Sequence, residues 1–178
     1  GGRDAFIGKL DSLFTADSKL EGESTSVDIS GLIGQYAHGN EPSHHIAHLY
    51  NYVGQPWRTQ EIVDEVLHTL YFNNPDGLSG NEDCGQMSAW YILNAMGFYQ
   101  VCPGKSVYSI GRPLFNEATV HLKDGKSFKV IAHNNSRDNK YVQSIVLNGN
   151  KLETPFFTHQ DIVDGGTLEL TMGSEPLK

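Results

Sequence analysis

The amino-acid sequence predicts an α+β fold, with helices in the first part of the chain and strands in the second. Apolar residues recur at helical spacing before Pro103-Gly104, and they alternate at strand spacing after it. In the second part, Asp124-Gly125 lies between two alternating runs, which is a strong hairpin signal. We therefore divide the chain into residues 1–102, which are helical, and residues 103–178, which form a β-rich module.

In the first part, a short segment at 28–36 is compatible with a helix, and clear helical spacing is found at 4–14, 43–52, 59–72 and 85–96. Pro42 precedes the second of these helices, Thr59 is a suitable N-cap for the third, and Gly97 is a suitable stop for the fourth. Amphipathic helices with aromatic faces should pack on more helices than this chain supplies. We therefore expect them to belong to a larger helical array, such as a toroid of helical hairpins.

The second part is expected to form hairpins, with strands at 118–122, 128–132, 142–147 and 167–172. Asn148-Gly149-Asn150 supplies a further turn after the third strand. We expect these strands to form a small antiparallel, β-sandwich-like module.

The chain carries a formal net charge of −8, and its 13 Lys and Arg residues are scattered. A phosphate backbone needs a basic face, so the composition argues against nucleic acid as a partner. No apolar run is long enough for a membrane span, no segment resembles a signal peptide, and the missing initial Met is compatible with a trimmed product. Two cysteines, Cys84 and Cys102, are too few for a disulfide framework and leave their pairing and the compartment open.

Two short polar clusters stand beside predicted helices, at 39–45 and at 77–86. Each places carboxylates and amides in a loop that contains Gly or Pro, and an apolar helix follows each. Many active sites are built in this way, with functional groups on loops that a rigid helix supports.

In the first cluster, Pro42 favours an extended Glu41, and Asn40 offers an amide oxygen. Amide and carboxylate oxygens suit a hard cation such as calcium. A helix start with Ser43 as its N-cap, and with an acidic residue near the helix dipole, explains the same residues equally well. The local pattern leaves a calcium site and a helix cap as alternatives.

In the second cluster, Asp83 is placed to cap the helix at 85–96, which is the usual role of a single Asp before a helix. Gly80 and Gly85 would allow the backbone to approach a ligand closely. A cap alone does not need so many polar groups, and a functional site is favoured by the presence together of Asn81, Glu82, Asp83 and Gln86.

His44 and His48 are four residues apart on one helical face, a spacing that zinc ligands use. The His-Glu-x-x-His pattern is absent and no third ligand is evident, so packed or surface histidines explain the pair better. A zinc-dependent hydrolase is kept as a minor alternative.

Taken together, several segments closely resemble glycoside hydrolase family 92, and the resemblance extends over nearly the whole chain. They are His-Gly-Asn-Glu-Pro-Ser-His-His at 38–45, Leu-Tyr-Asn-Tyr at 49–52, Gly-Leu-Ser-Gly-Asn-Glu-Asp-Cys-Gly-Gln-Met-Ser-Ala-Trp at 77–90, Tyr-Ser-Ile-Gly-Arg-Pro at 108–113 and Asn-Gly at 148–149. Members of this family are calcium-dependent exo-α-mannosidases that invert the anomeric centre. The resemblance implies a β-sandwich, an (α/α)6 toroid and a small β-region, of which this chain contains the last toroid helices and the β-region.

The resemblance also implies roles for single residues. Asp83 matches the general base, and Asn40 and Glu41 match the calcium-binding stretch. The substrate-binding neighbours, which touch the sugar or lie behind residues that touch it, are His38, Glu82 and Gln86. Asn81 lies where many members have a second Asp, and residues 21–25 would shape the leaving-group subsite.

The family's general acid is a Glu in an upstream segment that this chain does not match, so the chain alone is expected to be inactive. The implied function is that of a fragment of an inverting exo-α-mannosidase for terminal α-mannosyl linkages, α-1,2 or another α-linkage. Its expected partners are a mannose-containing glycan and the rest of the parent enzyme, in a bacterial periplasm or secreted. The rival is a non-catalytic carbohydrate-binding or interaction module, with sugar-stacking candidates at Phe115, Phe156 and Phe157.

Overall fold

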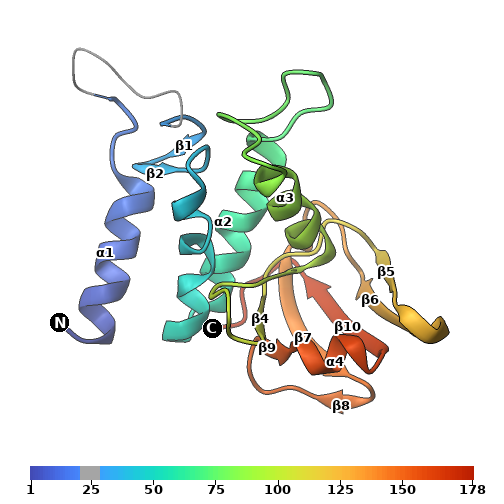
Figure 1. Ribbon diagram of the computed structural model, residues 1–178. Coiled ribbons are helices and arrows are strands. Elements are labelled where there is room, and N and C mark those ends of the chain that lie inside the picture. Colours follow the sequence, from blue (N-terminus) through green and yellow to red (C-terminus); the bar gives the residue numbers. More distant parts are fainter. Residues whose placement is uncertain (21–28) are drawn as a thin grey trace.

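The computed structural model describes residues 1–20 and 29–178 (Figure 1). The fold is α+β, as the sequence predicts, and the helices lie beside a β-rich part that contains most of the strands (Figure 1). No helix in these two ranges is long and apolar enough to cross a membrane.

Most of the expected helices are confirmed. The three long ones are α1 (Arg3–Thr15), α2 (Pro56–Thr69) and α3 (Gln86–Met96). Gly97 ends α3 with a left-handed φ of 103°, a conformation that costs glycine little. Thr59 is not an N-cap, because α2 already begins at Pro56 and Thr59 is buried within it.

Two expected helices of the first part have another structure. The segment at 43–52 forms the 3-10 helices η1 (Glu41–Ser43) and η2 (Ile46–Val53), which apolar periodicity over so short a segment does not distinguish from an α-helix. The described part of 28–36 is instead a small hairpin of β1 (Leu32–Ile33) and β2 (Tyr36–Ala37). Gly31 and Gly34 adopt φ values of 60° and 59°, which break a right-handed helix.

The β-rich part contains two sheets. The first has the order β5-β6-β10-β7-β8, with β5 (Glu117–His121), β6 (Ser127–His133), β7 (Tyr141–Leu147), β8 (Asn150–Lys151) and β10 (Gly166–Gly173). The second has the order β3-β4-β9, with β3 (Phe98–Tyr99), β4 (Val107–Ile110) and β9 (Phe156–Thr158). The predicted hairpin of β5 and β6 turns through η3 (Lys123–Gly125), with positive φ at Asp124 and Gly125.

The expectation of a purely antiparallel module is wrong at one place, because β10 pairs with β6 in parallel and with β7 antiparallel. A parallel pair needs a long crossover connection. Here the chain between β6 and β10 passes through β7, β8, β9 and the short helix α4 (His159–Val163), which supplies that length.

Two hydrophobic clusters form the core. The first holds Phe14, Tyr50 and Trp90 of the helical part. The second is shared by both sheets, as in a sandwich, and holds Phe128 of β6 and Phe157 of β9. The clusters meet at β3, whose adjacent residues belong to different cores. The division at residues 102 and 103 stays a prediction.

Buried polar contacts join the helical and β-rich parts. The ring of His48 contacts Ser109 Oγ through Nδ1 at 3.1 Å and Asn94 Oδ1 through Nε2 at 2.8 Å. Farther along, Asp64 of α2 pairs with Arg112 at 3.0 Å, and the Arg112 side chain is only 2% exposed. This buried ion pair fixes how the two parts pack on each other, because a misplaced partner would leave a buried charge unpaired.

Candidate functional site

The two polar clusters meet at one open pocket. It has a volume of about 510 Å³ and is lined by Glu41, Pro42, His44, His45, Asp83, Gln86, Tyr99, Gln100, Val101 and Pro103. A carboxylate from each cluster, Glu41 and Asp83, therefore faces the same space although the residues are far apart in sequence. Pockets of this size, with a few convergent polar groups, are typical of ligand sites.

A contact between two glycines holds the loops together. A Cβ atom placed on Gly80 would lie 2.8 Å from the carbonyl oxygen of Gly39 and 3.3 Å from its Cα, so the two backbones touch. Gly80 also has a φ of 71°, which other residues adopt only at a cost. The sequence predicted that Gly80 allows close approach to a ligand. The structure shows that it allows close approach to the other loop.

The backbone that carries Asp83 is unusual. Asp83, Cys84 and Gly85 have successive φ values of 46°, 57° and 90°, so three residues in a row lie in the left-handed region. A non-glycine residue in this region costs about 1 kcal/mol or more and is found most often at functional sites. This turn places the exposed Asp83 side chain at the pocket just before α3 begins.

Gly85 occupies the N-cap position of α3, and the carboxylate that bonds the first turn is Glu82, so the alternative in which Asp83 caps the helix is not supported. Glu82 accepts from the backbone N–H of Ser88 at 3.1 Å and from its hydroxyl at 3.0 Å. In the part of the chain that the structure describes, the Asp83 carboxylate has no hydrogen bond or ion pair with another side chain. The turn therefore uses one carboxylate for structure and leaves the adjacent one available to a ligand. A direct sugar contact by Glu82 stays a prediction.

His38 lies beneath the pocket and is fully buried. Its Nε2 is 2.7 Å from the Tyr71 hydroxyl, which donates to the carbonyl of Met87 at 3.1 Å, and its Nδ1 is 2.9 Å from the Tyr36 hydroxyl. Because Tyr71 donates to Met87, its oxygen accepts from His38 Nε2–H, and Nδ1 is left to accept from Tyr36. Burial, with a smaller contribution from His44, lowers the pKa of His38 to about 3. His38 is thus a neutral bridge between the loops, behind the residues that line the pocket.

His44 and Gln86 form the wall of the pocket. The His44 ring stacks on His38 with centroids 4.7 Å apart, and its Nε2 is 3.0 Å from the carbonyl oxygen of His38. The amide nitrogen of Gln86 is 3.2 Å from His44 Nδ1 and 3.3 Å from the Tyr99 hydroxyl. Both amide protons of Gln86 are then used, and its amide oxygen stays available to accept from a hydroxyl group of a ligand. Tyr99 was not predicted as a site residue, and His44 was considered only as a zinc ligand.

The zinc alternative is not supported. His44 uses its two ring nitrogens for His38 and Gln86, and His48 uses its two for Ser109 and Asn94. Burial lowers the pKa of both rings, with that of His48 at about 4. Within residues 1–20 and 29–178, no group of three or more His, Cys, Asp or Glu residues could hold a metal ion.

The Asn40-Glu41 turn offers donors of the type that calcium prefers. Asn40 is exposed and extended, with φ −117° and ψ 106°, and Glu41 begins η1 at the pocket. Ser43 is not a cap, because its hydroxyl donates to the carbonyls of Ala37 and Asn40, each at 2.7 Å. The oxygen donors fit a calcium ion, but two side chains supply only part of the roughly 6–8 oxygens that calcium takes. Other ligands would come from water, substrate or another part of the protein.

The remaining candidates lie in different surroundings. Phe157 is 3% exposed and stacks on Phe128, so it is a core residue rather than a sugar-binding one. Phe156 packs on Tyr52, with ring centroids 4.8 Å apart, and Phe115 is exposed. Cys84 and Cys102 are exposed free thiols. The predicted leaving-group segment at 21–25 lies outside the described residues.

Comparison with known proteins places this chain in a family. The profile described as the glycosyl hydrolase family 92 catalytic domain matches residues 1–174. An uncharacterized secreted glycosidase from Arthroderma benhamiae is 31% identical over 178 residues, which are 98% of this chain and 21% of that protein.

Solved structures give the same result. A family GH92 α-mannosidase from Bacteroides thetaiotaomicron is 44% identical with a TM-score of 0.89, and the match covers 99% of this chain and 23% of that one. An inverting mannosidase of family GH92 from Bacteroides thetaiotaomicron VPI-5482 is 41% identical with a TM-score of 0.83, over 99% of this chain and 25% of that one. The chain therefore spans about a quarter or less of the length of these relatives.

Proposed function

Because the chain belongs to glycoside hydrolase family 92, we propose that it is the C-terminal part of the catalytic region of an inverting exo-α-mannosidase. The observation that carries the proposal is the pocket that joins Glu41 and Asp83, since the family resemblance assigns these residues to the cation and to the base. The substrate would be a terminal α-mannosyl unit of a glycan, in α-1,2 or another α-linkage. The helical part would complete an (α/α)6 toroid with upstream helices of the parent enzyme.

We assign Asp83 as the general base. In an inverting reaction, a carboxylate removes a proton from the water that attacks the anomeric carbon, while an acid on the opposite face protonates the leaving oxygen. The two carboxyl groups are typically about 6.5–9.5 Å apart to leave room for that water. Asp83 suits the role of base because it is exposed at the pocket and is not used as a cap. The acid would come from the upstream part of the enzyme, so this chain alone should be inactive.

Asn40 and Glu41 would hold the calcium ion through an amide oxygen and a carboxylate. The ion would supply positive charge beside the sugar hydroxyls, which helps to distort the ring toward the planar transition state. Gln86 would accept a hydrogen bond from a sugar hydroxyl through its amide oxygen, because its amide protons are used by His44 and Tyr99. His38 would act indirectly, by fixing the distance between the loops. We further propose that the parent enzyme is a bacterial protein that is secreted or periplasmic.

The test is the hydrolysis of α-mannosides by the full-length protein, with the anomeric form of the released mannose followed by proton NMR. We expect β-mannose as the first product, and no hydrolysis by residues 1–178 alone. Release of α-mannose first would contradict the inverting mechanism, and full activity of the isolated chain would contradict the missing acid. Binding of glycan without hydrolysis by the full-length protein would instead support the rival, a carbohydrate-binding module.

A further inference from the structure

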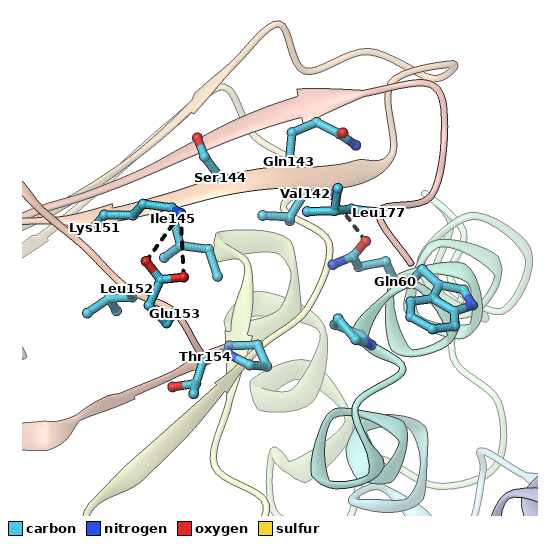
Figure 2. A pocket seen from close by; sticks show the side chains of 13 residues that line it. Gln60, Val142, Gln143, Ser144, Ile145, Lys151, Leu152, Glu153, Thr154 and Leu177 are labelled. Atoms are coloured by element: carbon cyan, nitrogen blue, oxygen red, sulfur yellow. Dashed lines mark hydrogen bonds and ion pairs between the residues drawn. The ribbon is translucent and has the colours of Figure 1, made fainter.

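A second cavity lies away from this pocket, between the start of α2, the strands β7 and β8, and the C-terminal tail (Figure 2). Its volume is about 170 Å³, and it shares no lining residue with the pocket of Glu41 and Asp83. Pro56 and Trp57 line it from α2, and Leu177 lines it from the tail. None of the roles proposed above uses this cavity.

A buried amide points into the cavity. Gln60 is only 3% exposed, and its side-chain oxygen accepts from the backbone N–H of Val142 at 3.1 Å. Figure 2 shows the amide nitrogen on the other side, directed into the space of the cavity. No acceptor for this nitrogen is found among the residues that the structure describes. This donor is open to the cavity, where it could bond an acceptor oxygen of a ligand.

The rest of the lining combines flat apolar surfaces with a neutral polar rim. Trp57, Pro56 and Pro155 are among the lining residues, and rings of this kind suit the C–H face of a pyranose. At the rim, Lys151 and Glu153 pair at 3.2 Å and are 65% and 77% exposed. Because these charges cancel, the cavity favours a neutral ligand over an anion, and both groups can bond hydroxyls.

We propose that this cavity is a second sugar-binding site, which holds one neutral pyranose unit of a glycan at a distance from the bond that is cleaved. The choice of mannose as that sugar rests on the proposed function, whereas the site itself rests on Gln60 and the ring-lined wall. Such a site would increase the affinity for a polymer through a second contact and would leave the reaction of a small substrate unchanged.

The test uses the full-length protein and compares α-mannan with a small synthetic aryl α-mannoside. We expect Trp57→Ala to raise KM for α-mannan at least 5-fold and to change kcat/KM for the aryl mannoside less than 2-fold. Gln60→Glu keeps the acceptor oxygen for Val142 and removes the amide donor, so it should also raise KM for α-mannan. Phe6→Ala, at an exposed aromatic of α1 outside the cavity, is the matched control and should change neither value. Melting curves identify variants that fold.

Equal changes for the polymer and the small substrate in Trp57→Ala, or no change for the polymer, would overturn the second site. The proposed function is tested separately. If the protein hydrolyses no α-mannoside, retardation on gels containing neutral polysaccharides still tests the cavity. Retardation that Trp57→Ala abolishes would support a sugar site. Retardation that Trp57→Ala leaves intact, or no retardation on any of the gels, would refute it.

Discussion

The structural role of Glu82 and the proposed catalytic role of Asp83 can be tested separately with one substitution at each position. The Glu82 carboxylate accepts two hydrogen bonds from Ser88 at the start of α3, whereas the Asp83 carboxylate makes none with another side chain in the described part of the chain. Loss of a capping side chain costs about 0.5–2 kcal/mol, and loss of a negative charge near a helix start costs about 0.3–1 kcal/mol. Glu82→Ala should therefore reduce the free energy of unfolding by about 1–2 kcal/mol and lower the Tm.

Asp83→Asn should behave in the opposite way. Asn is one of the few residues that tolerates the left-handed region, and it has nearly the same shape, so the free energy of unfolding should change by less than about 0.5 kcal/mol. As general base, Asp83 should contribute a factor of about 10²–10⁴ to kcat, which Asn would lose, while substrate binding is kept.

The assay measures kcat on an α-mannoside and thermal unfolding by circular dichroism on the same samples of full-length protein. Asp76→Asn, in the exposed loop before the cluster, is the matched control and should change neither quantity. The reasoning is refuted if Asp83→Asn turns over substrate at a near-normal rate. It is also refuted if Asp83→Asn lowers Tm more than Glu82→Ala, because Asp83 would then be the cap.

Three other predictions concern the metal, the histidines and the buried ion pair. Exhaustive chelation should inactivate the full-length enzyme, and added calcium should restore its activity. Asn40→Ala should raise the calcium concentration needed for half-activity at least 10-fold. Activity that survives chelation would contradict a role for calcium. Burial lowers the pKa of His48 from 6.5 to about 4, so the unfolded state binds a proton that the folded state does not between these values. The free energy of unfolding from urea titrations should therefore fall as pH decreases from about 6.5 toward 4, and His48→Gln should flatten this slope; an unchanged slope would show that His48 does not cause it. Arg112→Met should reduce the free energy of unfolding by about 1–3 kcal/mol, because it removes the nearest cation of Asp64 while Arg137 and Lys140 stay 3.7 and 3.9 Å from that carboxylate. No measurable loss would show that water already reaches the pair.

The parts of the fold that the sequence predicted are those with a local physical cause. Asp124-Gly125 forms the expected turn because both residues adopt positive φ, and Gly97 ends α3 for the same reason. The errors arise where tertiary structure decides. The parallel pairing of β10 with β6 depends on a connection of several elements, and no local pattern in either strand indicates its partner.

The candidate site follows the same rule. The motifs identified the loops, and in the structure Glu41, Asp83 and Gln86 line one pocket. They did not show which of the two adjacent carboxylates bonds the first turn of α3, because this depends on the backbone conformation of residues 83–85, whose φ values are positive. They also missed Tyr99, which reaches the pocket from β3 and has no sequence neighbour in either cluster.

The position of Asp83 depends on uncharged groups, and this explains why the motif contains residues that do not line the pocket. Gly80 permits contact with Gly39, and His38 connects the same two loops through its bonds to tyrosines. A charged bridge at this depth would require a buried counter-ion, and its geometry would change with pH. A neutral histidine avoids both effects, since burial lowers its pKa to about 3 and keeps it uncharged near neutral pH. The motif thus separates the groups that set the geometry from those that carry the charge, and a substitution of either glycine should move Asp83 without changing its chemistry.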